Sequence, residues 1–194
     1  MNAPGRMKSV ARWVSIVFHP FVTTLVLAGG VEMRRGPAAA ARGVAAVAIL
    51  FILPLALLTV RQVRSGAWAT VDASHRRDRP VLYAVGGGAL LALIGYLAVA
   101  HPGSPMLRGA AGTLGMLAAC ALATVWVKVS LHMAVAALAA AVLVTLGSPA
   151  GWVLLAALPL LAWSRVALGR HRPIEVIVGG AIGAVSGILL ARIG

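Results

Sequence analysis

Acidic residues are scarce in this sequence of 194 residues, which contains only four of them. Charged residues of both signs make up 11% of the chain and hydrophobic residues 61%, a balance typical of polytopic membrane proteins rather than soluble globular ones. The single cysteine, Cys120, excludes an internal disulfide. The composition therefore predicts an all-α, polytopic transmembrane helical bundle without a separate soluble domain.

Negative charge is so rare that the 17 basic residues give the chain a net charge of +13. In a soluble protein this excess would suggest nucleic-acid binding. Aromatic residues are only 5% of the chain, and its basic residues occupy short loops between apolar segments. The positive charge is better explained by anchoring at the interface and by attraction to anionic lipid headgroups. We expect membrane lipids as partners and no nucleic acid.

Long apolar runs fill most of the sequence. A bilayer core about 30 Å thick requires about 20 apolar residues in each crossing helix. Because the fifth and sixth runs are short and joined by Gly-Ser-Pro-Ala-Gly, they could form a tight hairpin, which leaves six to seven spans in a single membrane domain over residues 1–194. The expected spans are residues 13–31, 43–60, 81–100, 109–127, 131–147, 151–164 and 174–191.

The stretch 163–183 combines ionisable side chains with a membrane helix. Ser164, Arg165, His171 and Glu175 lie within it, and an apolar, glycine-spaced segment follows. An ionisable residue that reaches the bilayer core costs about 2.5–3.5 kcal/mol. Basic residues here could simply anchor the helix at the interface. An anchor needs no acid, so Glu175 favours a functional site.

The spacing of these residues resembles a known motif. Ser164-Arg165, five residues, His171, three residues and an acid is similar to the third signature motif of the type 2 phosphatidic acid phosphatase superfamily. The resemblance implies that His171 is a nucleophile, that Glu175 orients it and that Arg165 binds phosphate. The family usually has aspartate where this chain has glutamate, which is one methylene longer and has the same acid chemistry.

Residues 61–80 form the most polar stretch of the chain. Arg79-Pro80 resembles the end of the family's first motif, in which a lysine precedes the arginine by seven positions. This sequence has Asp72 at that position, and a carboxylate cannot bind phosphate as the lysine does. The stretch could instead be an ordinary positive loop on the cytoplasmic side. If it belongs to a site, the cations that could replace the lysine are Arg76, Arg77 and Lys128.

A third polar stretch precedes the fifth apolar run. Ser130-Leu-His132 resembles the second motif, Pro-Ser-Gly-His, without its proline and with leucine for glycine. The resemblance implies that His132 is the acid for the leaving group and that Ser130 contacts phosphate, although Ser130 could also be a helix N-cap. Two expected spans separate each stretch from the next, so 72–80, 128–132 and 164–175 should share one membrane face.

The resemblance implies a membrane lipid-phosphate phosphatase that hydrolyses a phosphomonoester or diphosphate through a phosphohistidine. Arginine binds phosphate bidentately and stays charged, so we expect no metal and no other cofactor. A phosphorylated lipid is the expected partner. The alternatives are a non-enzymatic transporter or lipid-binding relative and a lipid phosphotransferase. With His171, His132 and Glu175 as catalytic residues, the expected phosphate-binding residues are Arg165, Ser130, Lys128, Arg79 and Arg76.

The resemblance also implies a protein of the bacterial inner membrane. The sequence does not indicate its oligomeric state. Loop cations favour a cytoplasmic site under the positive-inside rule, whereas many bacterial members of the family face outward. Within the first span, His19-Pro20 predicts a kink, with a structural role for His19 favoured over a functional one.

Overall fold

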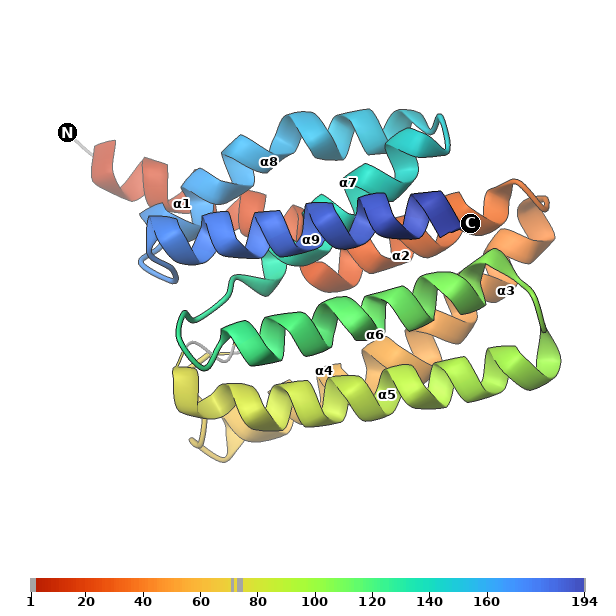
Figure 1. Ribbon diagram of the computed structural model, residues 1–194. Helices are drawn as coiled ribbons and strands as arrows, with labels where there is room; N and C mark the ends of the chain where they lie inside the picture. The colour runs from red at the N-terminus through yellow and green to blue at the C-terminus, as the bar shows by residue number, and fades with distance from the viewer. Residues whose placement is uncertain (1–2, 71, 73–74, 194) are drawn as a thin grey trace.

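The computed structural model describes residues 3–70, 72 and 75–193 as a bundle of helices (Figure 1). No strand occurs in this part of the chain, so the predicted all-α bundle is confirmed. The helices are α1 (Ala3–Val17), α2 (Pro20–Met33), α3 (Pro37–Val47), α4 (Leu53–Arg64), α5 (Arg79–Ala100), α6 (Pro105–Ala123), α7 (Leu131–Thr145), α8 (Pro149–Ala167) and α9 (Pro173–Ile193), with a π-helical turn at Ala48–Ile52 and a 3₁₀ turn at Arg76–Asp78.

Within the described residues, six helical stretches are long and apolar enough to cross a membrane, as an integral membrane protein requires. The expected run 131–147 is the shorter helix α7, whose 15 residues reach about 22 Å at 1.5 Å each and so fall short of a 30 Å core. The six long stretches are Gly5–Met33, Pro37–Arg64, Arg76–Ala100, Pro105–Ala123, Pro149–Ala167 and Pro173–Arg192.

The predicted fourth span, 109–127, was displaced by four residues from the helix that forms. Helix α6 runs from Pro105 to Ala123. Ser104 begins it, because its hydroxyl accepts a hydrogen bond from the Leu107 N–H at 3.2 Å and Pro105 suits the first helical position. Residues 124–130 are thereby left outside the helix and form the connection to α7.

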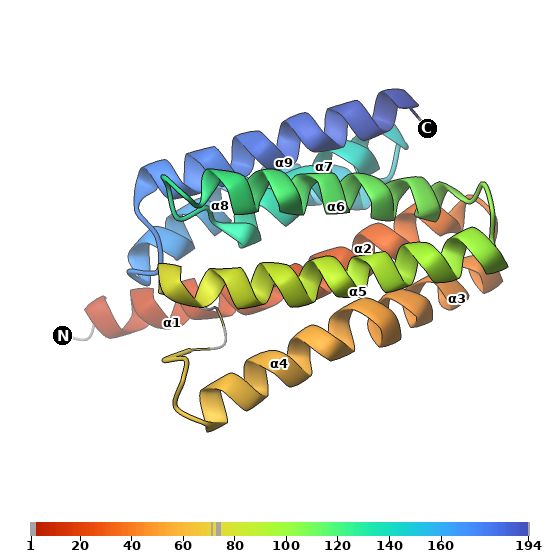
Figure 2. The ribbon, with the colours of Figure 1, turned by 60° about the horizontal axis from the view of Figure 1, so that its bottom comes forward.

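Helix α7 lies at the centre of the half that contains the C-terminus. It packs against α9, α8 and α2, and most of its side chains are buried. Helices α3 to α6 form the other half, in which α5 packs against α6 and α4 (Figure 2). A polar residue near the start of α7 therefore lies inside the protein rather than on its surface.

Three glycines, Gly179, Gly183 and Gly187, let α9 approach α7 closely. A methyl group at Gly179 would lie 2.5 Å from the Ser130 carbonyl oxygen, and one at Gly187 would lie 2.8 Å from that of Leu138. At Gly183 the methyl would overlap the carbonyl oxygen of Ala134. This is the small-residue packing expected between membrane helices, and it fixes the start of α7 against the start of α9.

Proline residues shape two of the membrane stretches. Pro20 ends α1 and begins α2, with His19 as the N-cap residue, so the predicted kink is a break between two helices. Pro54 follows the π-helical turn Ala48–Ile52. Because proline has no N–H and its ring crowds the preceding turn, the wider turn relieves that clash.

The three polar stretches lie at the same end of the bundle, as expected from their spacing. Helices α5, α7 and α9 begin at that end and α8 finishes there (Figure 1). Helix α1 also begins there, whereas the C-terminus lies at the opposite end. This end therefore carries the candidate site.

The close approach of α7 and α9 predicts a position-specific effect of alanine. Alanine is favoured over glycine in a helix by up to about 1 kcal/mol. Gly183→Ala should nevertheless destabilise the protein by about 1–3 kcal/mol, because its methyl would be forced into the Ala134 backbone.

The measurement is the thermal midpoint of each variant in detergent. Gly95→Ala on α5 is the matched control, because nothing lies within 4 Å of the methyl position there, and it should be neutral or stabilising. Equal midpoints for the two variants would contradict the close packing of α7 and α9.

Candidate active site

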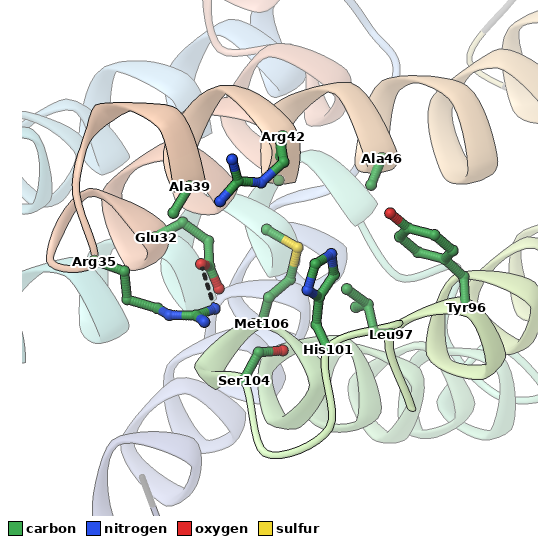
Figure 3. A pocket seen from close by; sticks show the side chains of 11 residues that line it. Glu32, Arg35, Ala39, Arg42, Ala46, Tyr96, Leu97, His101, Ser104 and Met106 are labelled. Atoms are coloured by element: carbon green, nitrogen blue, oxygen red, sulfur yellow. Dashed lines mark hydrogen bonds and ion pairs between the residues drawn. The ribbon is translucent and has the colours of Figure 1, made fainter. Parts of the chain in front are cut away.

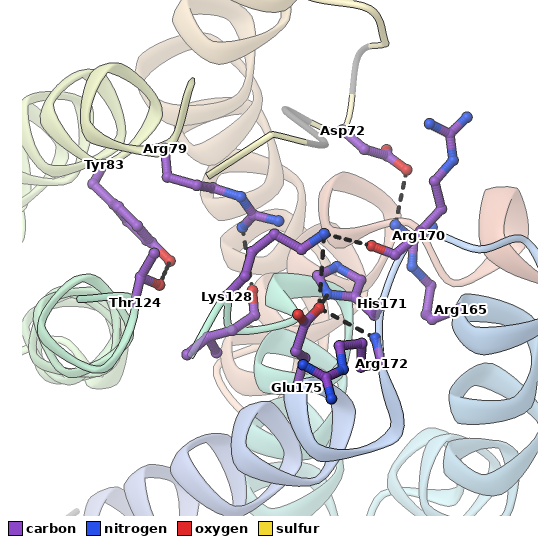
Figure 4. A network of polar contacts seen from close by, with 11 residues as sticks. Asp72, Arg79, Tyr83, Thr124, Lys128, Arg165, Arg170, His171, Arg172 and Glu175 are labelled. Carbon is purple, nitrogen blue, oxygen red and sulfur yellow. Dashed lines mark hydrogen bonds and ion pairs between the residues drawn. The ribbon is translucent and has the colours of Figure 1, made fainter. Parts of the chain in front are cut away.

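His171 and Glu175 form a hydrogen-bonded pair at the start of α9 (Figure 4). The His171 ring nitrogen Nδ1 lies 2.8 Å from Glu175 Oε2, and the same oxygen accepts the Arg172 N–H at 3.2 Å. The glutamate therefore reaches the imidazole despite its extra methylene. With the Nδ1 proton directed at the carboxylate, the lone pair of Nε2 is left for a ligand.

The connection from α8 to α9 is held by backbone bonds. Both Arg170 and His171 donate their N–H groups to the Arg165 carbonyl, at 3.1 and 3.2 Å. Helix α9 then begins at Pro173, one residue before the expected span 174–191, with Glu175 in its first turn. The helix N-terminus adds a partial positive charge to this end of the bundle.

Arg165 is the largest fully buried side chain in the described part of the protein, with 1% of its surface exposed. Its Nη2 donates to Asp72 Oδ2 at 2.9 Å, and its Nη1 donates to the Ser15 hydroxyl. Nothing in the sequence predicted that Asp72 or Ser15 would accept a hydrogen bond from Arg165. Asp72, at the position where the resembled motif has a lysine, lies at the site as the partner of an arginine.

Lys128 lies beside the His171–Glu175 pair. Its Nζ is 3.7 Å from Glu175 Oε2 and donates to the Arg170 carbonyl at 2.8 Å. Arg77, by contrast, has a largely exposed side chain, and its Nε lies 3.9 Å from Oδ1 of its sequence neighbour Asp78. Among the cations considered as replacements for the lysine, Lys128 is thus held against the site by contacts with Glu175 and Arg170, while Arg76 lines the outer edge of the site.

Arg79 and Ser130 are both buried between the helix starts. Arg79 donates from Nη1 to the Val129 carbonyl at 3.3 Å, and the Ser130 N–H donates to the Glu175 carbonyl at 3.1 Å. Ser130 occupies the N-cap position of α7, but its side chain makes no capping hydrogen bond. A purely structural capping role therefore does not account for its hydroxyl.

Several buried polar atoms at this end have no hydrogen-bond partner among the residues that the structure describes. Buried polar groups are normally paired, because an unpaired one costs about 1–3 kcal/mol. A polar ligand or an ordered water at the site would pair with these atoms. They are Asp78 Oδ2, Ser130 Oγ, His132 Nε2, Ser164 Oγ and Arg165 Nε.

Two hollows adjoin the buried polar residues of the candidate site. The outer one is a depression of about 410 Å³ lined in part by Arg76, Lys128, Arg172 and Glu175. The inner one, a cavity of about 100 Å³, is mostly apolar and extends between α2, α4, α5, α6 and α7. Its polar wall consists of His19, Asp72, Arg79, His132 and Arg165, with Thr24, Thr59 and Thr113 along its length.

The linings of the two hollows contain more positive than negative charge. Five cationic side chains stand against two carboxylates, which favours an anionic ligand. The cations are Arg76, Arg79, Lys128, Arg165 and Arg172, and the carboxylates are Asp72 and Glu175.

His19, Asp72 and His132 lie closer together than their positions in the sequence suggested. One ring nitrogen of each histidine and one carboxylate oxygen lie within 4.8 Å of one another, a grouping that their spacing in the sequence does not indicate. A divalent cation fits poorly, because the Arg165 guanidinium is 2.9 Å from the carboxylate. His19 Nδ1 already accepts the Phe21 N–H at 3.2 Å, which places the proton of the neutral ring on Nε2.

The site shifts the pKa of two groups in its connecting segments. Burial lowers the pKa of His171 to about 4; the Glu175 hydrogen bond opposes this, and the charges of Arg79, Arg165 and Lys128 add to it. Burial would raise the pKa of Asp72, but the charges of His132 and Arg165 outweigh it and bring that pKa to about 2. At neutral pH His171 is therefore an uncharged imidazole and Asp72 a carboxylate.

A smaller pocket lies at the opposite end of the bundle (Figure 3). Glu32 is buried there and pairs with Arg35 at 3.0 Å, and Arg42 and His101 also line the pocket. The cavity has a volume of about 30 Å³, room for one or two waters. A water can satisfy the unpaired Glu32 Oε1, so this pocket needs no other ligand.

Comparisons of this chain with protein-family models, with curated proteins and with solved structures give no match.

The lowered pKa of His171 predicts a loss of stability in acid. As pH falls from about 6.5, the ordinary histidine value, to about 4, the unfolded chain binds a proton that the folded protein does not. The free energy of unfolding should decrease through this window. Asp72 contributes only at lower pH, because its folded pKa is about 2.

The measurement compares thermal midpoints near pH 7 and pH 4.5 for the native protein and His171→Gln, which should lose less stability between them. His101→Gln, at the other end of the bundle, is the control and should behave like the native protein. An equal loss in all three would show that His171 does not titrate in this window.

Proposed function

We propose that this protein is a membrane phosphatase that hydrolyses the phosphomonoester or diphosphate of a lipid through a phosphohistidine. The observation that carries the proposal is the His171–Glu175 pair, 2.8 Å apart, at a helix N-terminus surrounded by buried cations. Neutral His171 has a free Nε2 lone pair, and a nucleophile of this kind requires an oriented, uncharged ring.

Phosphate is the anion that the surrounding side chains suit best. Its non-bridging oxygens can accept hydrogen bonds from the guanidinium groups of Arg165 and Arg79, from the Lys128 ammonium and from the Ser130 hydroxyl. Ser130 Oγ and Arg165 Nε are buried and have no partner within the described part of the chain, and phosphate would satisfy them. With cations already in place, phosphoryl transfer depends mainly on positioning and charge stabilisation.

His132 takes the role of acid in this reaction. It lines the inner cavity, where its Nε2 is buried without a partner. In the first step His171 attacks phosphorus and His132 protonates the departing oxygen of the lipid. In the second step water attacks the phosphohistidine, and His132 takes up the proton of that water.

The inner cavity favours a lipid as the leaving group. Leu55, Leu90 and Met116 are among the apolar residues that line it, and a further cavity of about 50 Å³ shares Thr24 and Leu90 with it. A hydrocarbon chain can lie in this space while the phosphate faces the cations. Phosphatidic acid, a polyprenyl phosphate or diphosphate, and a lipid-linked sugar phosphate fit this description.

We infer from the motif resemblance that the chain is a divergent member of the type 2 phosphatidic acid phosphatase superfamily. The departures are Asp72 for lysine, Glu175 for aspartate and the altered second motif. Membership also suggests the inner membrane of a bacterium, and a reporter fused at the C-terminus would test which face holds the site.

The first test is phosphate release by the purified full-length protein in mixed micelles of detergent and phosphatidic acid or polyprenyl diphosphate. Release is expected, together with transfer of label from a ³²P-labelled substrate to the protein in an acid-labile form. His171→Ala should abolish both, because no nucleophile remains.

His101→Ala is the control for this test and should retain full activity, because it lies at the opposite end of the bundle. Labelled protein that transfers phosphate only to an added alcohol would indicate a phosphotransferase. Lipid binding without label or release would indicate a transporter or binding protein.

Arginine geometry provides a further prediction. Arg165→Lys keeps the charge but loses the planar fork, so the proposed activity should fall at least tenfold, about 1.4 kcal/mol. Phosphate release is measured beside Arg35→Lys, which alters an ion-paired arginine at the other end and should cost nothing. Near-normal activity of Arg165→Lys would remove this residue from the phosphate site.

A further inference from the structure

Asp72 stands where the resembled motif has a phosphate-binding lysine, and its surroundings suggest a different task. It lines the inner cavity beside His132, with one carboxylate oxygen within 4.8 Å of a ring nitrogen of His132 and of His19. Its Oδ2 also accepts a hydrogen bond from Arg165 at 2.9 Å. A carboxylate would repel phosphate, so its location next to the proposed acid requires an explanation.

His132 needs help to carry a proton. A general acid must be protonated before the leaving oxygen departs. The ring is buried, and burial opposes a positive charge. The charged and titratable groups that act on it are Arg165 from α8, Asp72 from the α4–α5 connection, His19 from the α1–α2 break and His171 from the α8–α9 connection. Burial and the Arg165 charge lower the pKa of His132 well below its ordinary value, and of these four groups only Asp72, as a carboxylate, opposes that shift.

We propose that Asp72 is a positioning residue that keeps the proton on His132 until the leaving oxygen of the lipid takes it. The role rests on the proposed function. A carboxylate has two oxygens and about four acceptor sites, so Asp72 can serve Arg165 and His132 together. Opposite charges within about 4–6 Å favour the ionised form of both partners.

His132 loses one proton in the first step and regains one in the second. In the first, the bond from phosphorus to the lipid oxygen breaks as the bond to His171 Nε2 forms, and the His132 proton passes to the lipid oxygen to give an alcohol. In the second, water attacks phosphorus, its proton passes to His132 and the bond to His171 breaks. Asp72 remains a carboxylate throughout and never touches the phosphate.

His19 completes this arrangement. Its ring packs edge-on against that of His132, with centroids 5.1 Å apart and an interplanar angle of 87°. The hydrogen bond from the Phe21 N–H fixes the His19 ring in turn. The break at Pro20 therefore places a rigid ring where it limits rotation of His132.

The test is Asp72→Asn in the full-length protein, assayed on a lipid phosphomonoester and on an aryl phosphate. A lipid alkoxide is a poor leaving group that needs an acid, whereas a nitrophenolate does not. The variant should lose about 10²-fold on the lipid ester, within the range that general acids contribute, and less than tenfold on the aryl ester. The falling limb of its pH profile on the lipid ester should move about one unit or more toward lower pH.

His132→Ala should show the same contrast between substrates, and adding Asp72→Asn to it should cost little more. Asp72→Glu should restore part of the lipid activity. Asp78 is a buried acid of the same stretch, and Asp78→Asn is the matched control. It should change neither the ratio of lipid-ester to aryl-ester activity nor the pH profile. Asparagine keeps an acceptor for Arg165, and the thermal midpoint verifies that Asp72→Asn folds.

An equal loss on both substrates with an unmoved pH limb would overturn the proposal, because Asp72 would then act only by holding Arg165. Loss of native activity in a chelator, restored by a divalent metal, would overturn it too, because the three side chains would then be metal ligands. If the native protein forms no labelled intermediate and releases no phosphate, the proposed function itself fails. Failure of the Asp72 proposal and failure of the proposed function are therefore seen in different measurements.

Discussion

The close contact between α7 and α9 places the two halves of the candidate site together. The backbone of α9 approaches that of Ser130 at Gly179 and that of Ala134 at Gly183. The Ser130 N–H donates a hydrogen bond to the Glu175 carbonyl at 3.1 Å. These contacts fix where His132 lies relative to the start of α9. Because the approach leaves no room for a methyl group, the relation between the two helices is set by backbone shape and not by adaptable side chains.

Buried charge imposes the second constraint. Arg79 and Arg165 are 2% and 1% exposed, and such charges are costly unless each is paired or hydrogen-bonded. Carbonyl groups, Ser15 and Asp72 meet this requirement, and a bound anion would meet it further. The four acidic residues of the chain are therefore informative: Asp72 and Glu175 both face this cluster, in a sequence that otherwise carries almost no negative charge.

The sequence allowed the helical bundle, most of the spans and the shared face of the three polar stretches to be predicted, because apolar run length and the number of crossings determine them. The pairing of His171 with Glu175 was expected from the motif resemblance, and a spacing of four residues at a helix start allows it. The partners of Arg165 could not be predicted, because Ser15 and Asp72 are distant in sequence and match no local pattern. His19-Pro20 was an available signal, but a proline kink explained it equally well until the ring was seen against His132.

The depth of the two histidines bears on the direction in which a lipid would bind. The start of α7 is level with residues 175–179 of α9, so His132 lies farther inside the bundle than His171, which precedes α9. The apolar cavity begins at His132, and the cationic depression adjoins Glu175. In an in-line reaction the nucleophile and the leaving oxygen lie on opposite sides of phosphorus. Under the proposed chemistry the leaving oxygen therefore faces inward, and the chain attached to it is directed into hydrocarbon-like space while phosphate departs toward water.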